Sequence, residues 1–538
     1  MIKDSIYINF ILKNVSKLCT QIDRDEDSPT FGSCDRNFWH LKIRDFSSAT
    51  LQQAGLTIAL LYNLNFNGNY FYKNNNAFKW AKATVDYWKK IQLKDGSFNE
   101  YYPNEHGFPP TAFTLFSSCE IYKQLNLNDK NLISSFKKSG KCLVNNIEKD
   151  AFNQEIASIT ALYSLCSIIN ETWIIDGINY KLKRVLKYQS KEGWFPEYGG
   201  CDFGYLSVTL DMLAEYYYQS KDNRVIAPLE KIIEFIKYFV HPDGTIGGEY
   251  GSRNTEYFLP NGLEIMINLG SKDAFAIKRK IYQNIYNDKH FLYSIDDRYF
   301  SHYVMHSFLR ALEKEKNINM EKIYLPNESA CIKYFKEAGL ICNSKKNYYS
   351  IISLKKGGII KVFYKYKEEF TDFGYRVIKG KNKISITNWL DNDYKICWDG
   401  LNTAKVSGHF NIIKLQISTP LKHFVLRILS FLFGKSIIGL LKKKLIFISK
   451  HDSIEFIRKI KFKKASIILI DMINSKKPID LKSANSLSLR HVASGKFFKN
   501  TEIIHKKRIH LKNITNVKIM QIFDLESKEV LVKHEKLD

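Results

Sequence analysis

The sequence predicts an α+β protein of two parts, an N-terminal (α/α) toroid followed by a C-terminal antiparallel β-sandwich. Three observations predict this order. Apolar residues recur every three to four positions over residues 48–315, a spacing typical of helices. After residue 341 they alternate with polar residues, as in strands. Residues 341–538 also hold 40 Lys and Arg against 16 Asp and Glu, which gives +24 of the chain's net charge of +26.

We expect three segments along the chain. Residues 1–47 form a docking segment for the N-terminus, residues 48–330 form the toroid, and residues 345–538 form the basic β-sandwich. The expected helices cover residues 49–62, 77–92, 111–125, 155–169, 205–219, 225–240 and 302–315, and the expected strands lie within residues 348–366, 376–389, 404–418, 453–463 and 465–473.

Three loops of the helical part resemble one another. They are IQLKDGSFNEYYP at residues 91–103, YQSKEGWFPEYGG at residues 188–200, and YFVHPDGTIGGEYGSRNT at residues 238–255. Each follows a helix, turns on an acidic residue and a glycine, and then presents Glu and Tyr. This repetition fits helical hairpins arranged around a ring, with equivalent loops gathered at one end. Such an end is a natural ligand cleft.

One segment interrupts the β pattern. Residues 421–445, LKHFVLRILSFLFGKSIIGLLKKKL, hold six Lys and Arg and no acid. They predict either an amphipathic helix in peripheral contact with an anionic membrane or an inserted helix packed on the sandwich. No stretch is long and apolar enough to predict a spanning helix. Nine scattered cysteines without CxxC spacing, and an N-terminus unlike a signal peptide, predict a cytoplasmic protein, with the inner membrane as the alternative peripheral location.

Two polar clusters lie in the first hundred residues. CDRNFWHLKIRD at residues 34–45 supplies Trp39 to stack on a sugar ring and Arg side chains to pair with carboxylates, unless it only docks the N-terminus. EYYPNEH at residues 100–106 supplies a general acid and base in Tyr and His. The candidate residues from these clusters are Arg36, Trp39, His40, Arg44 and Tyr102 for substrate binding and His106 for catalysis.

The two later loops supply further candidates. Paired glycines let backbone approach a ligand, and carboxylate, phenol, guanidinium and amide groups follow them. His302 and His306 are four residues apart, as in some metal sites, but no third ligand is evident. We therefore expect the two histidines to be cleft or core residues, and we expect neither a metal nor a cofactor. The substrate-binding candidates are Glu197, Asp202, Glu249, Arg253, Asn254 and His302, and Tyr250 is a catalytic candidate.

These loops and this domain order resemble the heparinase II/III-like polysaccharide lyases and the related uronyl epimerases. In that family an Asn neutralises the substrate carboxylate, and a Tyr some fifty residues later acts as acid and base. The resemblance implies these roles for Asn153, in AFNQEIASITAL, and for Tyr205, 52 residues on. Gln154 stands where several members have His, so His106 or His40 takes the role of base. The resemblance also implies that residues 490–498 reach toward the cleft edge.

The resemblance implies a function on an acidic, uronic-acid-containing polysaccharide. Abstraction of the C5 proton would lead to β-elimination or epimerisation, in surface glycan (capsule or O-antigen) metabolism. Two alternatives stay open. Paired carboxylates, Glu100 or Glu105 with Glu197 or Asp202, suit a glycoside hydrolase. The basic charge also suits a non-catalytic glycan-binding protein. No recognition motif predicts nucleic acid binding.

Overall fold

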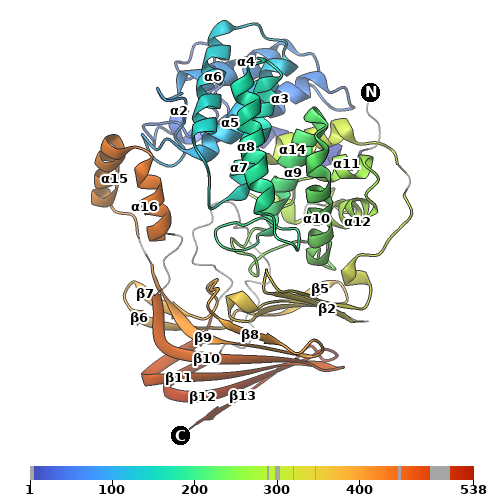
Figure 1. Cartoon of the computed structure of the whole chain (residues 1–538), viewed down its shortest axis with the longest axis vertical. Helices are drawn as coiled ribbons and strands as arrows, with labels where there is room; N and C mark the ends of the chain where they lie inside the picture. Colours follow the sequence, from blue (N-terminus) through green and yellow to red (C-terminus); the bar gives the residue numbers. More distant parts are fainter. Residues whose placement is uncertain are drawn as a thin grey trace.

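The computed structural model describes residues 5–537 apart from 288–289, 297, 299–302, 319, 346, 416, 446–449 and 485–508. The predicted site residue His302 and the predicted cleft-edge segment 490–498 therefore lie outside the described residues. Helices fill the first part of the chain and antiparallel strands the second (Figure 1). This confirms the predicted fold class.

A closed ring of inner helices forms the centre of the helical part. Each inner helix packs against the next, and the last packs back on the first. These helices are buried around most of their circumference, because Ala, Ser and Thr let neighbouring backbones approach. In the described part of the chain they are α3 (Ala54–Asn63), α5 (Phe108–Gln124), α7 (Phe152–Cys166), α9 (Phe203–Ser220), α11 (Asn261–Asn268) and α14 (Met305–Lys314).

Outer helices cover the ring and complete its pairs. Five of them follow an inner helix directly, and each buries one apolar stripe against the ring. The sixth pair combines α14 with the N-terminal helix α1, so the segment predicted to dock closes the toroid. A short helix, α2 (Arg36–Trp39), leads from α1 to the ring. The outer helices are α1 (Ile6–Cys19), α4 (Asn75–Lys90), α6 (Lys130–Asn145), α8 (Thr172–Lys187), α10 (Ile226–Ile236) and α12 (Lys272–Tyr282).

Two antiparallel sheets form the second part. The first has the order β1-β2-β3-β4-β5, and the second has the order β10-β9-β7-β6-β11-β12-β13, with β8 paired to β9. The first sheet comprises β1 (Cys331–Phe335), β2 (Leu340–Lys345), β3 (Tyr348–Ser353), β4 (Ile359–Tyr364) and β5 (Lys367–Asp372). The second comprises β6 (Tyr375–Gly380), β7 (Lys383–Ile386), β8 (Lys395–Trp398), β9 (Thr403–Lys414), β10 (Lys450–Phe462), β11 (Ser466–Ser483), β12 (His510–Asp524) and β13 (Val530–Lys536).

The five-stranded sheet lies between the toroid and the second sheet (Figure 1). Successive side chains of a strand point to opposite faces of the sheet. Alternate residues of these strands therefore pack against the toroid and against the second sheet. Cys342 and Ile351 belong to the core shared with the helices, whereas Ile341 and Ile352 belong to the core between the sheets. The toroid and the sandwich are therefore joined through a sheet whose three central strands, β2, β3 and β4, are buried on both faces.

Two helices leave the second sheet between β9 and β10. They are α15 (Pro420–Phe433) and α16 (Ser436–Leu445), and we call them the α15–α16 hairpin. The hairpin is held by polar contacts to the toroid loops, including Arg427 with Asp45 and Lys442 with Glu148. Its polar partners lie on the toroid, and the two helices lie beside the helical part of the chain (Figure 1). The alternative that the inserted segment packs on the sandwich was therefore wrong. Among the described residues, no helix combines the length and apolar character needed to cross a bilayer.

Candidate active site at the loop end of the toroid

Asn153 and Glu197 form a buried pair at the loop end of the ring. Asn153 begins the inner helix α7, and Glu197 belongs to the loop between α8 and α9. The backbone N–H of Asn153 donates to Glu197 Oε1 over 2.7 Å, and Nδ2 donates to Glu197 Oε2 over 3.0 Å. Burial raises the pKa of the Glu197 carboxyl well above its ordinary value, although the Asn153 N–H lowers it. The pair fixes the orientation of the Asn153 amide, which retains a second Nδ2 hydrogen.

Tyr198 and Arg253 lie directly beside this pair. The Arg253 guanidinium lies 4.4 Å from the centroid of the Tyr198 ring, and both side chains are buried. Gln154 Nε2 approaches Tyr198 Oη to 3.5 Å. Burial raises the pKa of Tyr198, the Arg253 charge lowers it, and Tyr205 raises it. Tyr198 has a φ of 52°, a strained conformation that is uncommon for a bulky residue and that clusters at functional sites.

Tyr205 stands in the first turn of α9, half-buried. Its backbone N–H donates to the capping residue Asp202, over 3.3 Å to Oδ1. Asp202 also accepts the Arg253 N–H over 2.8 Å and the Thr255 hydroxyl. Burial raises the pKa of Asp202, while these donors lower it. Asp202 therefore holds the segments that carry Tyr205 and Arg253 together, and its role is to position them.

The α15–α16 hairpin closes one side of the cluster. Lys442 Nζ lies 5.7 Å from the centroid of the Tyr198 ring. The same ammonium pairs with Glu148 over 2.7 Å and with Asp150 over 3.3 Å, on the loop that precedes Asn153. Lys442, which follows Glu148 by 294 positions in the sequence, thus adds a positive charge to the cluster.

The loop of residues 247–255 is tied to the five-stranded sheet. Lys356 Nζ donates to the backbone oxygen of Glu249 over 2.5 Å and to Asn254 Oδ1 over 2.8 Å. Lys361 Nζ pairs with the Glu249 carboxylate over 2.8 Å. Burial lowers the pKa of Lys361, but the surrounding carboxylates raise it well above its ordinary value. Glu249 and Asn254, predicted to bind substrate, thus contact the β-domain.

Tyr250, a predicted catalytic residue, lies inside the same junction. Its side chain is 2% exposed, and its hydroxyl lies 2.8 Å from His241 Nε2. Its ring packs against Phe203 and Phe239. These contacts place Tyr250 in the core between the toroid and the sheet.

The first predicted loop holds His106 in a separate network. His106 Nδ1 lies 2.8 Å from Asp95 Oδ2 and 2.9 Å from Ser97 Oγ. Close by, Glu105 Oε2 accepts the backbone N–H groups of Glu100 and Tyr101 over 2.5 and 2.7 Å. Burial and the charge of Glu100 raise the pKa of Glu105 to about 8.

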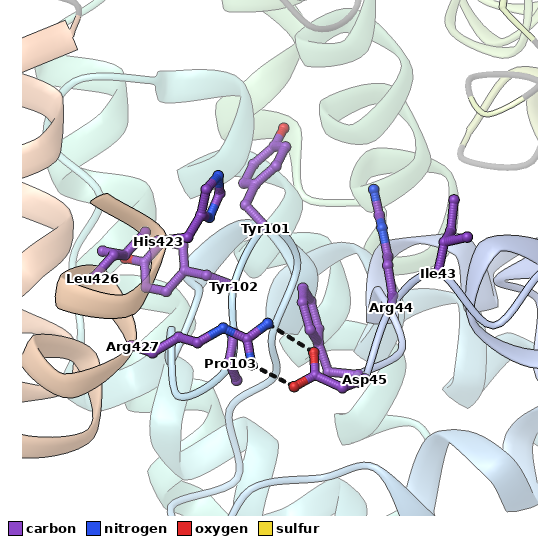
Figure 2. A pocket seen from close by; sticks show the side chains of 10 residues that line it. Ile43, Arg44, Asp45, Tyr101, Tyr102, Pro103, His423, Leu426 and Arg427 are labelled. Atoms are coloured by element: carbon purple, nitrogen blue, oxygen red, sulfur yellow. Dashed lines mark hydrogen bonds and ion pairs between the residues drawn. The ribbon is translucent and has the colours of Figure 1, made fainter. Parts of the chain in front are cut away.

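A cavity of about 260 Å³ lies between this loop and the hairpin (Figure 2). Tyr102 is 7% exposed and lines the cavity, and its hydroxyl has no hydrogen-bond partner among the described residues. Arg427 on α15 forms one wall of the cavity and makes two hydrogen bonds to the Asp45 carboxylate. The bond from Nη2 to Oδ1 measures 2.9 Å. The predicted residues Arg44 and Tyr102 are thus brought together in one cavity, with Tyr101 and His423.

The remaining predicted binding residues lie on or next to α2. Trp39 donates its indole N–H to the Gln21 backbone oxygen over 2.8 Å, and its ring packs against His40. Arg36 and Trp39 are partly buried, and His40 is exposed. The indole N–H of Trp39 is therefore used to fasten the N-terminal segment.

One group among the described residues has the composition of a metal site. Asp391, Asp393 and His451 offer ligand atoms that all lie within 4.8 Å of one another. His451 Nε2 lies 3.0 Å from Asp391 Oδ2, so the two side chains also satisfy each other directly. The group belongs to the β-domain, next to Leu390, whose side chain packs at Gly200 in the loop that carries Glu197.

Comparison with known proteins relates this chain to others through its fold. No protein-family model and no curated protein sequence matches it. The chondroitin AC lyase of Streptomyces coelicolor A3, solved with chondroitin sulphate, matches with a TM-score of 0.55 and 10% identity over 89% of this chain and 67% of that chain. A tyrosine-to-alanine mutant of that lyase matches with a TM-score of 0.50 and 9% identity over the same shares. Heparinase III matches with a TM-score of 0.45 and 10% identity over 97% of this chain and 88% of that chain.

At 9–10% identity, the two chondroitin AC lyase structures show a shared fold. The fold is the one that the sequence resemblance implied, a helical toroid followed by a β-sandwich. Sequence reasoning missed Tyr198 and Lys442. The signal for Tyr198 was its place before two glycines in EYGG, a sequence typical of a tight turn.

Proposed function

We propose that this protein acts on an acidic, uronic-acid-containing polysaccharide by abstracting the C5 proton of a uronate. The observation that carries the proposal is the Asn153 amide, held by Glu197 beside Tyr198, Tyr205 and Arg253. An amide and a guanidinium can stabilise a uronate carboxylate as it takes up charge, and a phenol can move the proton. The fold shared with a lyase that was solved with chondroitin sulphate supports the same reaction class.

The chemistry follows from the position of the proton. Removal of the C5 proton leaves negative charge on the carboxylate, and a fixed donor near that oxygen lowers the barrier by an amount worth about 10²–10³ in rate. The second Nδ2 hydrogen of Asn153 supplies this donor. Tyr205, half-buried at the start of α9, is the candidate base, because a catalytic phenol must reach the substrate.

Two products can follow from the same intermediate. In β-elimination, the electron pair of the broken C5–H bond forms a C4–C5 double bond, and the C4–O bond breaks with protonation of the leaving oxygen. In epimerisation, a proton returns to C5 from the opposite face, and no bond to C4 breaks. In β-elimination, Tyr205 holds the abstracted proton and can pass it to the leaving oxygen, because its half-buried side chain can reach the substrate.

We place this reaction in surface glycan metabolism, with a capsule or O-antigen chain as the substrate. The support is the +24 net charge of residues 341–538, which attracts a polyanion. The cavity offers further groups that suit an acidic polysaccharide. Guanidinium groups pair with carboxylates and phenols pack on sugar rings, and the cavity is lined by Arg44, Tyr102 and Arg427.

A glycoside hydrolase is less well supported, because its carboxylates have other partners. Glu105 accepts two backbone N–H groups, and Glu100 pairs with Arg298 over 3.2 Å. Glu197 holds Asn153, and Asp202 caps α9. These contacts use at least one oxygen of each carboxyl group that a hydrolase would turn toward the glycosidic bond.

The test is incubation with a panel of uronic-acid polysaccharides in deuterated water. Elimination gives an unsaturated uronide that absorbs in the ultraviolet, epimerisation gives deuterium uptake without cleavage, and hydrolysis gives cleavage with neither signal. We expect the first or the second signal, and we expect Asn153→Ala and Tyr205→Phe to abolish it. Salt-sensitive binding of every polysaccharide without turnover would instead establish a glycan-binding protein.

A further inference from the structure

The outer face of α15 carries an exposed apolar stripe. In a helix with 3.6 residues per turn, its members fall within an arc of about 120°. Phe424 is 61% exposed and Phe431 is 76% exposed, and the least exposed members are still 44% exposed. The apolar stripe consists of Leu421, Phe424, Val425, Ile428, Phe431 and Leu432.

The opposite face of α15 is the one that contacts the protein. Arg427 pairs with Asp45. Ser430 is fully buried and donates to the backbone oxygen of Pro103 over 2.9 Å. His423 faces the cavity beside the toroid loop. A surface helix ordinarily turns its apolar side toward the core. Here the polar side is fastened to the protein, and the apolar side is presented outward.

Basic side chains accompany the stripe. Residues 421–445 contain six Lys and Arg and no acid. Arg427, Lys435 and Lys442 contact the toroid, whereas Lys422 and Lys443 are exposed. Apolar bulk surrounded by cationic charge is the composition that interfacial helices use on anionic lipid. A second copy of this chain is a poorer occupant, because a symmetric contact between two such faces would bring the same cations together.

We propose that the α15–α16 hairpin seats the protein on an anionic membrane surface through the apolar stripe. The stripe enters the boundary between headgroups and acyl chains, and the flanking lysines contact anionic headgroups. Because Arg427 and Lys442 fasten the hairpin to the toroid loops, this seating holds the loop end of the toroid at the membrane. The inference concerns binding alone and does not depend on the proposed reaction.

The test is flotation of the full-length protein with vesicles, in the absence of any glycan. We expect binding to mixed phosphatidylcholine–phosphatidylglycerol vesicles to exceed binding to phosphatidylcholine vesicles at least about tenfold, and to weaken between about 0.1 and about 0.5 M salt. The double variant Phe424→Ser, Phe431→Ser removes two large apolar groups and should lower the partition coefficient about 100-fold.

The matched control is the double variant Ile175→Ser, Leu401→Ser. These side chains are 43% and 68% exposed and lie outside the hairpin, so this variant should bind like the wild type. Equal binding by the wild type and the Phe424, Phe431 variant would overturn the proposal, since charge elsewhere on the chain would then account for the binding. A dimer in sedimentation equilibrium that the Phe424, Phe431 variant abolishes, without vesicle binding, would assign the stripe to a second copy.

Discussion

Replacement of Asn153 by Ala tests the catalytic role of its amide, provided that the effect on the reaction rate is distinguished from the effect on stability. The variant removes the Nδ2 donor that we assign to the substrate carboxylate. It keeps the backbone N–H that donates to Glu197 Oε1 over 2.7 Å, so one of the two donors to Glu197 remains. The loss of one transition-state donor costs about 10²–10³ in kcat. The loss of the buried 3.0 Å bond to Glu197 costs about 1–3 kcal/mol of stability.

Asn261 supplies the matched control. Its Nδ2 donates to Glu215 Oε2 over 3.0 Å, and both residues are buried, as Asn153 and Glu197 are. Glu215 lies ten residues beyond Tyr205 on α9, which is about 15 Å along the helix. Asn261→Ala should therefore lower the thermal midpoint about as much as Asn153→Ala and leave the rate unchanged.

The assay compares the two variants on the polysaccharide that the panel identifies. Initial rates come from ultraviolet absorbance or deuterium uptake, and thermal midpoints come from circular dichroism. We expect Asn153→Ala to lose at least about 100-fold in rate and Asn261→Ala to stay within about threefold of the wild type. A rate for Asn153→Ala close to that of Asn261→Ala would refute the assignment of the amide to the substrate carboxylate.

Three further outcomes follow from single contacts. Tyr205→Phe should lose about 10²–10⁴ in rate, because it removes the hydroxyl that we assign to acid–base catalysis and keeps the ring. Glu105→Gln should gain stability relative to the wild type between about pH 4.5 and about pH 8 in thermal melts. Folding raises the pKa of Glu105 from 4.5 to about 8, so the wild type loses stability as pH rises through this window. Lys361→Met should cost about 3–5 kcal/mol in denaturant unfolding, because it leaves Glu249 buried without its cation.

The fold class was predictable because period and charge both change near residue 340. Several helices nevertheless fell outside the predicted ranges, among them α6 and α8. Both carry a glycine at a close contact. A Cβ on Gly140 would lie 2.5 Å from Leu165, and one on Gly177 would lie 2.6 Å from Val144. Glycine weakens the local helical signal, and the tertiary contact that requires it is invisible in the sequence.

The sequence predicted several residues of the candidate site one by one, but it did not predict the contacts between them. Asn153, Glu197 and Arg253 were all candidates, yet the sequence does not reveal that Glu197 holds the Asn153 amide or that Arg253 covers Tyr198. Both relations join different loops, and only closure of the ring brings those loops together. Lys442 was harder still, because its partner Glu148 lies 294 residues away on a different domain.

The hairpin shows why an apolar pattern alone does not give the direction that a helix faces. Spacing identifies the stripe on α15, and the ordinary expectation turns such a stripe inward. The direction is set instead by Arg427, Ser430 and Lys442, whose partners are an acid, a backbone oxygen and two acids on the toroid loops. Because these contacts also form walls of the cavity and the site, turning the stripe inward would break both. The outward stripe is therefore a consequence of how the site is closed.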